Sequence, residues 1–85
     1  METSVEAEVR AVLAAHARLA GDPAGLDLHD DLYASGMTSH STVNVMLGLE
    51  DAFDIEFPER MLRKATFGTI SAISEAVAEL RTGIQ

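Results

Sequence analysis

The sequence predicts an all-α fold, a small bundle of three main helices and one short helix. Three segments carry apolar residues at spacings of three and four, the period of a helix that buries one face. Three such stripes are best buried by packing the helices against one another. No segment has a convincing strand pattern, and the 85 residues are expected to form a single domain, 1–85, with a thin core.

The first helix is expected to run from Ser4 to about Ala20. Gly21-Asp22-Pro23 stops it, because proline cannot continue a helix. One side of this helix should face the core, with His16 as a partly buried structural residue. The stripe on that side consists of Val5, Val9, Val12, Leu13, His16 and Leu19.

A long connection, Gly21 to Met37, separates the first two helices. Its seventeen residues exceed the length of a tight helical hairpin turn, so the two helices need not be direct hairpin partners. Spaced apolar residues predict that this loop is ordered and tied to the core, with Leu26, Leu28, Leu32 and Tyr33 as its anchors.

The second helix is expected to begin near Thr38 or Ser39 and to end near Phe53 or Asp54. At 100° per residue its core stripe comprises Thr42, Val45, Met46, Leu49, Ala52 and Phe53. The opposite side comprises His40, Val43, Asn44, Leu47, Gly48 and Asp51. Two sizeable apolar residues one turn apart, Val43 and Leu47, are therefore expected to meet water.

Pro58 suits the first position of a short third helix that ends near Lys64 or Ala65. Ile55-Glu56-Phe57 links it to the helix before it. Half of the six cationic side chains of the chain lie within this short helix, namely Arg60, Arg63 and Lys64. Gly68 or Thr69 is expected to cap the last helix, whose stripe is Ile70, Ile73, Val77, Leu80 and Ile84.

The net charge of −8 disfavours binding to nucleic acid or to anionic membrane surfaces and suits a basic protein partner. No cysteine is present, so the chain has no disulfide, thiolate metal site or thiol nucleophile. No apolar run could span a bilayer, and the acidic start lacks a signal-peptide pattern, so we expect a cytoplasmic monomer. A complete enzyme is not expected, because so small a core can hardly wall a substrate pocket.

The most informative segment is Gly36-Met37-Thr38-Ser39-His40, at the start of the second helix. From the residues alone, Thr38 and Ser39 are helix caps, each hydroxyl accepting a bond from a free backbone N–H. The same free N–H groups and the helix dipole also make this position a good seat for a phosphate. A serine here could therefore carry a phosphodiester.

This segment, with Val43, Leu47, Leu49-Glu50 and Phe53 after it, resembles the attachment region of acyl and peptidyl carrier proteins. Asp31-Leu32-Tyr33 matches the acidic-apolar pair that precedes the glycine in that family, and Ile55-Glu56-Phe57-Pro58 matches its link into the short third helix. The resemblance covers roughly Asp30 to Ile73.

The resemblance implies that a phosphopantetheinyl transferase attaches 4′-phosphopantetheine to Ser39, and that the thiol of the arm holds cargo as a thioester. It implies no catalytic residue and no metal in the carrier itself. Two residues depart from the commonest family motif: Thr38 stands where Asp is usual, and His40 where Leu is usual. Both raise the question of whether fatty-acid-synthase partners would recognise this chain.

The whole segment from Gly36 to Asp54 is similar to a narrower group, the small stand-alone aminoacyl carrier proteins. These are charged by amino acid:carrier protein ligases that resemble truncated class II aminoacyl-tRNA synthetases. The implied cargo is a small amino acid, glycine or alanine, destined for an unknown downstream acceptor enzyme. A carrier of fatty-acid, polyketide or nonribosomal peptide type is the alternative within the family.

The expected partner surface surrounds Ser39 and follows the exposed side of the second helix and the cationic third helix. It consists of Met37, Thr38, His40, Val43, Asn44, Leu47, Asp51, Arg60, Met61, Arg63 and Lys64. The cations could equally be a solvated surface near a helix C-terminus, or a contact for an acidic patch on the ligase. In the second case, reversing the charge of Arg60 and Arg63 together would weaken charging.

Other interpretations of these residues are weaker. His29-Asp30-Asp31 is a poor metal site, because adjacent loop residues rarely converge on one ion. A hydrolase using Ser39 and His40 is disfavoured, because neighbouring helical side chains point about 100° apart. The competing function from another class is an unmodified acidic adaptor that binds one partner through Val43 and Leu47.

Overall fold

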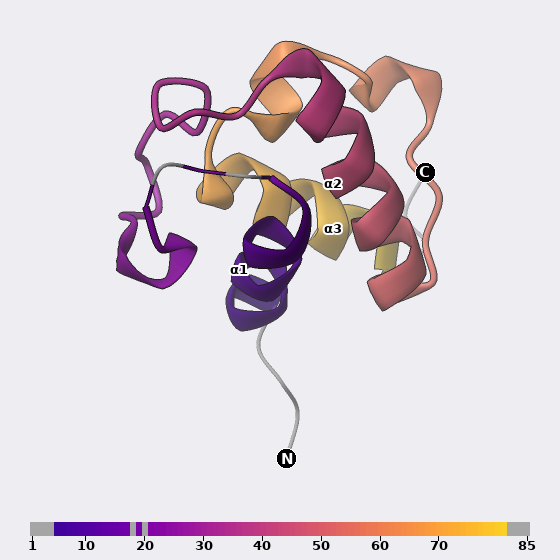
Figure 1. Cartoon of the computed structure of the whole chain (residues 1–85). Helices are drawn as coiled ribbons and strands as arrows, with labels where there is room; N and C mark the ends of the chain where they lie inside the picture. The colour runs from indigo at the N-terminus through magenta and orange to yellow at the C-terminus, as the bar shows by residue number, and fades with distance from the viewer. Residues whose placement is uncertain (1–4, 18, 20, 82–85) are drawn as a thin grey trace.

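The computed structural model describes residues 5–17, 19 and 21–81 and contains three α-helices within them. These are α1 (Val5–His16), α2 (Ser39–Phe53) and α3 (Ile70–Arg81). Three short 3₁₀ turns lie between them: η1 (Pro23–Gly25), η2 (Glu59–Met61) and η3 (Lys64–Phe67). The described part of the chain contains no strand, which confirms the predicted all-α class (Figure 1).

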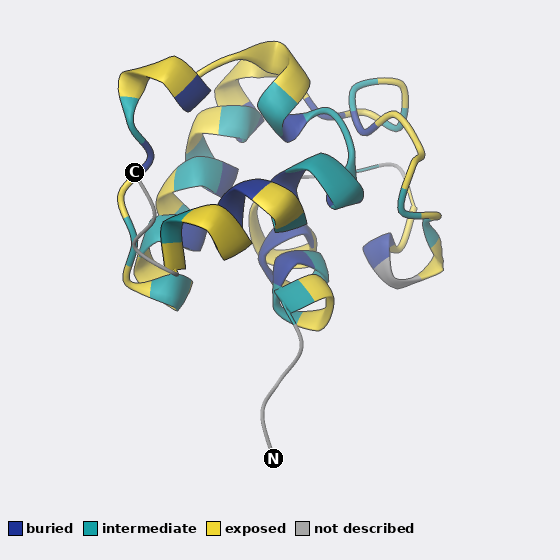
Figure 2. Ribbon diagram, turned by 180° about the vertical axis from the view of Figure 1, so that it is seen from behind, coloured by how far each residue is buried: buried dark blue, intermediate teal, exposed yellow. Residues whose placement is uncertain are grey.

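The core lies where the three long helices meet. α1 packs against both α2 and α3, and each helix shows buried positions along one side and exposed positions along the other (Figure 2). The predicted apolar stripes supply the largest fully buried side chains of these helices: Val9, Leu13, Val45, Leu49, Ile70, Ile73 and Val77. The periodicity of the sequence thus located the buried sides of all three helices.

The end of α1 differs from the prediction. The helix stops at His16 rather than near Ala20, which lies outside the described residues together with Ser4. His16 is exposed, although the stripe had placed it partly in the core. Its ring lies over the backbone of Gly48 in α2, where an added Cβ would come within 2.7 Å of His16 Cδ2. The imidazole thus lies against α2 at the surface and does not enter the core.

The long connection between α1 and α2 is ordered by the predicted apolar anchors. Leu32 is fully buried, and Leu26, Leu28 and Tyr33 pack against the core. The backbone also joins the start of α3: Leu32 N–H donates to Gly68 O at 2.8 Å, and Ser71 N–H donates to Leu28 O at 3.0 Å. Figure 1 shows this connection looping out beside the helices before α2 begins.

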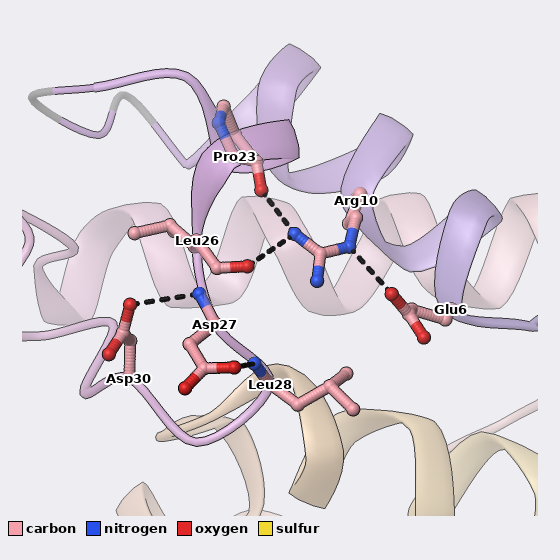
Figure 3. A network of polar contacts seen from close by, with 7 residues as sticks. All are labelled: Glu6, Arg10, Pro23, Leu26, Asp27, Leu28 and Asp30. Carbon is pink, nitrogen blue, oxygen red and sulfur yellow. Dashed lines mark hydrogen bonds and ion pairs between the residues drawn. The ribbon is translucent and has the colours of Figure 1, made fainter.

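Arg10 fastens the first part of the same connection to α1 (Figure 3). Its Nη1 donates to the carbonyl oxygens of Pro23 at 2.6 Å and Leu26 at 2.7 Å, while its Nε pairs with Glu6 at 3.0 Å. One partly buried guanidinium thereby donates to two loop carbonyls, of which Pro23 O also accepts the N–H of Leu26 within η1. The connection is consequently held from α1 on one side and from α3 on the other.

The predicted short third helix is wrong in its details, because the segment forms two separate 3₁₀ turns. Pro58 precedes the first turn as its N-cap, with extended backbone, rather than occupying a helical position. Met61 and Phe67 are both buried, and residues six apart in a continuous α-helix point about 120° away from each other. Breaking the segment at Leu62 and Arg63 lets both side chains reach the core.

Both boundaries of α2 and the start of α3 agree with the prediction. Asp54 ends α2 in the left-handed region with φ 55°, and Thr69 Oγ1 caps α3 by accepting the N–H of Ala72 at 3.0 Å. One position of the predicted core stripe of α2 differs, because Ala52 is exposed; Ser41, which the stripe did not include, is buried. Leu80 packs against the core as predicted, while Ile84 lies outside the described residues.

Candidate functional site

The start of α2 is closed by a reciprocal pair of hydrogen bonds between Thr38 and Ser41. Thr38 Oγ1 accepts the backbone N–H of Ser41 at 3.1 Å, and Ser41 Oγ accepts the backbone N–H of Thr38 at 2.8 Å. This is a capping box, and the spacing of two hydroxyl residues three apart was the signal in the sequence that could have found it. The sequence left the cap open between Thr38 and Ser39, and the structure assigns it to Thr38.

Ser39 is consequently free of any capping role. It is the first residue of α2 and it is exposed, and its hydroxyl makes no hydrogen bond to any of the described residues. The backbone N–H groups of Ser39 and His40 also lack an acceptor within that part of the chain, as expected for the first turn of a helix. An unengaged hydroxyl thus stands beside two unpaired donors and the positive end of the helix dipole.

The residues just before Ser39 fix its position at the surface. Gly36 adopts a φ of 117°, which an L side chain rarely tolerates, and turns the chain back toward the core. Met37 follows with its side chain 3% exposed and its N–H donating to Leu32 O at 3.0 Å. A buried anchor two residues before Ser39 therefore holds the serine where large partners can reach it.

Two residues predicted for the partner surface are core residues in the structure. Met37 is buried, and Met61 is 7% exposed. Met37 follows the turn at Gly36 and Met61 ends η2, and in both places the apolar side chain is directed inward, which sequence position near Ser39 does not reveal. The burial of Met37 and Met61 argues against their predicted place on a partner surface, and the other nine positions stay a prediction.

Two large apolar side chains of α2 face solvent, as the helical period predicts. Val43 is 51% exposed and Leu47 is 53% exposed, and we call this pair the apolar face. Exposed His40 and Asp51 and half-buried Asn44 are the other polar positions predicted around it. Gly48 does not belong to this exposed side, because its Cα lies against Val12 and His16 of α1.

A cavity of about 570 Å³ adjoins Ser39. It lies between the first turns of α2 and the segment that carries η3, and no pattern in the sequence indicates it. Tyr33 lines one side, where its hydroxyl is 3.2 Å from Thr42 Oγ1 and its ring lies 4.9 Å from Lys64 Nζ. Val43, Leu62 and Phe67 supply apolar lining, and Leu62 is 49% exposed.

The three clustered cations have different surroundings. Arg60 Nη2 pairs with Glu79 Oε2 of α3 at 2.8 Å, and this ion pair is largely exposed. Arg63 and Lys64 both line the cavity beside Ser39 and have no carboxylate partner among the described residues. The cluster predicted as one surface therefore divides into one paired cation and two cations near the serine.

The loop carboxylates that were considered as a metal site are not arranged to bind an ion. Asp30 Oδ2 accepts the N–H of Asp27 at 2.9 Å, and Asp31 Oδ1 accepts the N–H of Tyr33 at 2.9 Å, so both carboxylates serve the loop. Over residues 5–17, 19 and 21–81, no group of three or more His, Asp or Glu side chains could hold a metal. Within the same ranges, no helix is long and apolar enough to cross a membrane.

Comparison with known proteins agrees with this geometry. Residues 8–77 match the family described as Phosphopantetheine attachment site. The chain is 38% identical over 79 residues to the aminoacyl carrier protein of Agrobacterium fabrum, covering 93% of this chain and 95% of that protein.

Solved structures give the same result. The carrier protein of Agrobacterium tumefaciens, crystallised with an engineered Bradyrhizobium japonicum glycine:carrier protein ligase and AMP, superposes with a TM-score of 0.83 and 40% identity, over 86% of this chain and 97% of that one. The corresponding complex with ATP gives 0.84 and 39%, over 87% and 96%. A solution structure of an Agrobacterium tumefaciens protein gives 0.73 and 38%, over 92% and 94%.

The family match spans most of the chain, and Ser39 stands at the start of α2 with its hydroxyl unengaged. The chain belongs to the family of phosphopantetheine attachment domains.

Proposed function

We propose that this chain is a carrier protein that bears 4′-phosphopantetheine on Ser39 and holds a small amino acid as a thioester on the thiol of the arm. The observation that carries the proposal is the exposed Ser39 hydroxyl, free of hydrogen bonds to the described residues, in a chain of the attachment family. The surroundings fit the group. A phosphodiester at this position lies next to unpaired N–H groups and the helix dipole, which stabilise negative charge.

Attachment requires a second protein, a phosphopantetheinyl transferase, and coenzyme A. The Ser39 oxygen forms a bond to the phosphorus next to pantetheine, the pyrophosphate P–O bond breaks, and adenosine 3′,5′-bisphosphate leaves. The hydroxyl proton passes to a base of the transferase or to water. Because no base among the described residues contacts the hydroxyl, Ser39 provides the exposed attachment atom, and the transferase is proposed to activate it.

The amino acid is proposed to come from a partner ligase that first forms an aminoacyl adenylate from ATP. The arm's thiolate then attacks the carbonyl carbon, a C–S bond forms, and AMP leaves with the C–O bonding electrons. The Agrobacterium relative bears the name aminoacyl carrier protein, and the similar carrier was crystallised with a glycine:carrier protein ligase and AMP or ATP. Glycine is therefore the first cargo to test, and alanine the second.

The carrier presents the arm and has no catalytic residue of its own in this proposal. The partner surface that receives the transferase and the ligase is proposed to be the apolar face, Val43 and Leu47, with polar side chains around it. Exposed apolar side chains bury favourable area at an interface, and flanking polar groups restrict the choice of partner. The surface comprises Thr38, His40, Val43, Asn44, Leu47, Asp51, Arg60, Arg63 and Lys64.

Intact-protein mass spectrometry tests the proposal directly. The chain is incubated with coenzyme A and a phosphopantetheinyl transferase, alongside Ser39→Ala and the control Ser35→Ala, which removes a hydroxyl from the preceding loop. We expect one added phosphopantetheine on the wild type and on Ser35→Ala, and none on Ser39→Ala. Subsequent incubation with a ligase, ATP and glycine should add one glycyl group that hydroxylamine removes.

Two outcomes contradict this proposal. Absence of any mass gain with several active transferases would favour an unmodified adaptor that binds through the apolar face. A mass gain that persists in Ser39→Ala would place the arm on another residue.

A further inference from the structure

The cavity beside Ser39 joins an apolar interior to a cationic edge. Buried Phe67 lines it, together with half-exposed Val43 from α2 and half-exposed Leu62 from the link between η2 and η3. Arg63 and Lys64 follow Leu62 and line the same cavity. In a protein of net charge −8, two adjacent cations without carboxylate partners among the described residues create a local site for an anion.

We propose that this cavity seats the phosphate end of the arm against Arg63 and Lys64, and that the same two cations keep the charged aminoacyl end in solvent. The inference rests on the proposed function, because the anion in question is the phosphodiester on Ser39. It adds positioning roles for Arg63 and Lys64 that concern the arm rather than a partner protein. Leu62 and Val43 then contact the apolar part of the arm next to the phosphate.

The charge balance supports the seating of the phosphate. A phosphodiester on Ser39 adds one negative charge to a chain that already carries −8, so attachment raises the overall self-repulsion. Arg63 and Lys64 line the same cavity as Ser39. Charge-assisted hydrogen bonds from guanidinium or ammonium to phosphate are among the stronger kinds. Arg60 cannot do the same, because its guanidinium pairs with Glu79.

The same two cations that attract the phosphate repel the cargo. An aminoacyl thioester carries an α-ammonium group, and like charges at close range repel. A cavity whose lining includes Arg63 and Lys64 and no carboxylate offers that ammonium no counter-ion. The loaded amino acid consequently stays outside, where a downstream enzyme can take it without first extracting it.

Nuclear magnetic resonance of the apo, arm-bearing and glycyl-loaded protein tests this inference. On attachment of the arm, we expect the amide signals of Arg63 and Lys64 and the methyl signals of Leu62 to shift, although these residues lie more than twenty positions from Ser39. The shifts should shrink as NaCl is raised from about 0.05 to about 0.5 M, because salt screens the ion pair. Loading with glycine should add no further change at these signals.

The control variants distinguish the effect of Arg63 and Lys64 from that of the nearby cation Arg60. Arg63→Gln with Lys64→Gln should abolish the arm-induced shift of the Leu62 methyls, whereas Arg60→Gln should leave it unchanged, since Arg60 does not line the cavity. All variants are first checked by mass for complete attachment and by circular dichroism for helix content. The readout is thus independent of any ligase activity.

The outcomes distinguish this inference from the proposed function. Attachment on Ser39 without shifts at Leu62, Arg63 and Lys64 would overturn the inference and leave the carrier function standing. Shifts that appear only after a ligase is added would assign the cavity to docking and would also overturn it, as would new cavity shifts on glycyl loading. A wild type that accepts no arm at all would remove the proposed function and the inference together.

Discussion

Thr38 and Ser41 each accept the other's backbone N–H, at 3.1 and 2.8 Å, and this exchange leaves the serine between them without a structural task. Helix starts normally use whichever hydroxyl lies closest to the free N–H groups. Here both capping hydroxyls flank Ser39, whose own hydroxyl faces solvent. The two flanking residues therefore stabilise the helix start, and the serine between them remains available for the proposed modification.

Replacing Ser39 with alanine should remove attachment without destabilising the fold. Because Thr38 provides the cap, we expect the free energy of unfolding of Ser39→Ala to stay within about 0.5 kcal/mol of the wild type. Urea denaturation gives the stability and intact mass gives the attachment. A loss of about 1 kcal/mol or more would mean that Ser39 also contributes to the cap.

Replacing Thr38 should have the complementary effect. Thr38→Ala should lower the free energy of unfolding by about 1 to 2 kcal/mol, because Ser41 N–H loses its acceptor. Thr38→Asp restores a good capping oxygen and adds the carboxylate usual in the wider carrier family, so it should regain most of that loss. Equal stabilities of the two variants in urea denaturation would argue against the cap.

The apolar face should matter for charging and not for folding. Val43→Gln with Leu47→Gln removes two side chains that are about half exposed, so we expect little change in thermal stability. The kcat/KM of glycine transfer by the ligase should fall at least about tenfold, or about 1.4 kcal/mol. Ala52→Gln, exposed about 180° around α2 from Val43, is the matched control and should leave charging unchanged.

Arg10 should be the side chain that contributes most to holding the long connection against α1. Arg10→Gln withdraws the donor from Pro23 O and Leu26 O, and we expect a loss of about 2 kcal/mol in the free energy of unfolding. Glu6→Gln removes only the partly exposed ion pair to the same arginine and should cost less than about 0.5 kcal/mol. Hydrogen exchange should show faster exchange at Gly25 and Leu26 in Arg10→Gln alone.

Gly48 permits the close approach of α1 and α2 at His16. A Cβ at position 48 would lie 2.7 Å from His16 Cδ2 and 3.0 Å from Val12 Cγ1. In a double-mutant cycle, Gly48→Ala should be about 1 kcal/mol more favourable in a His16→Ala background than in the wild type, because the ring no longer obstructs the methyl group. Additive effects in urea denaturation would show that the imidazole moves aside freely.

The sequence by itself determined the helical class, the buried side of each long helix and the serine at the start of α2. These are local properties: the 3.6-residue period, the turn residues and the Gly-Met-Thr-Ser-His motif lie within short windows of the chain. The same locality explains why the exposure of Val43 and Leu47 was predictable. Each follows from its angle on one helix.

Only the tertiary structure decided how the third helical segment breaks and that a cavity adjoins Ser39. The break at Leu62 arises because Met61 and Phe67 must both reach the core, a requirement set by the packing of distant segments. After that break, Leu62, Arg63 and Lys64 line the same cavity as Val43 of α2. No local pattern encodes such a juxtaposition, since it depends on where the other helices leave space.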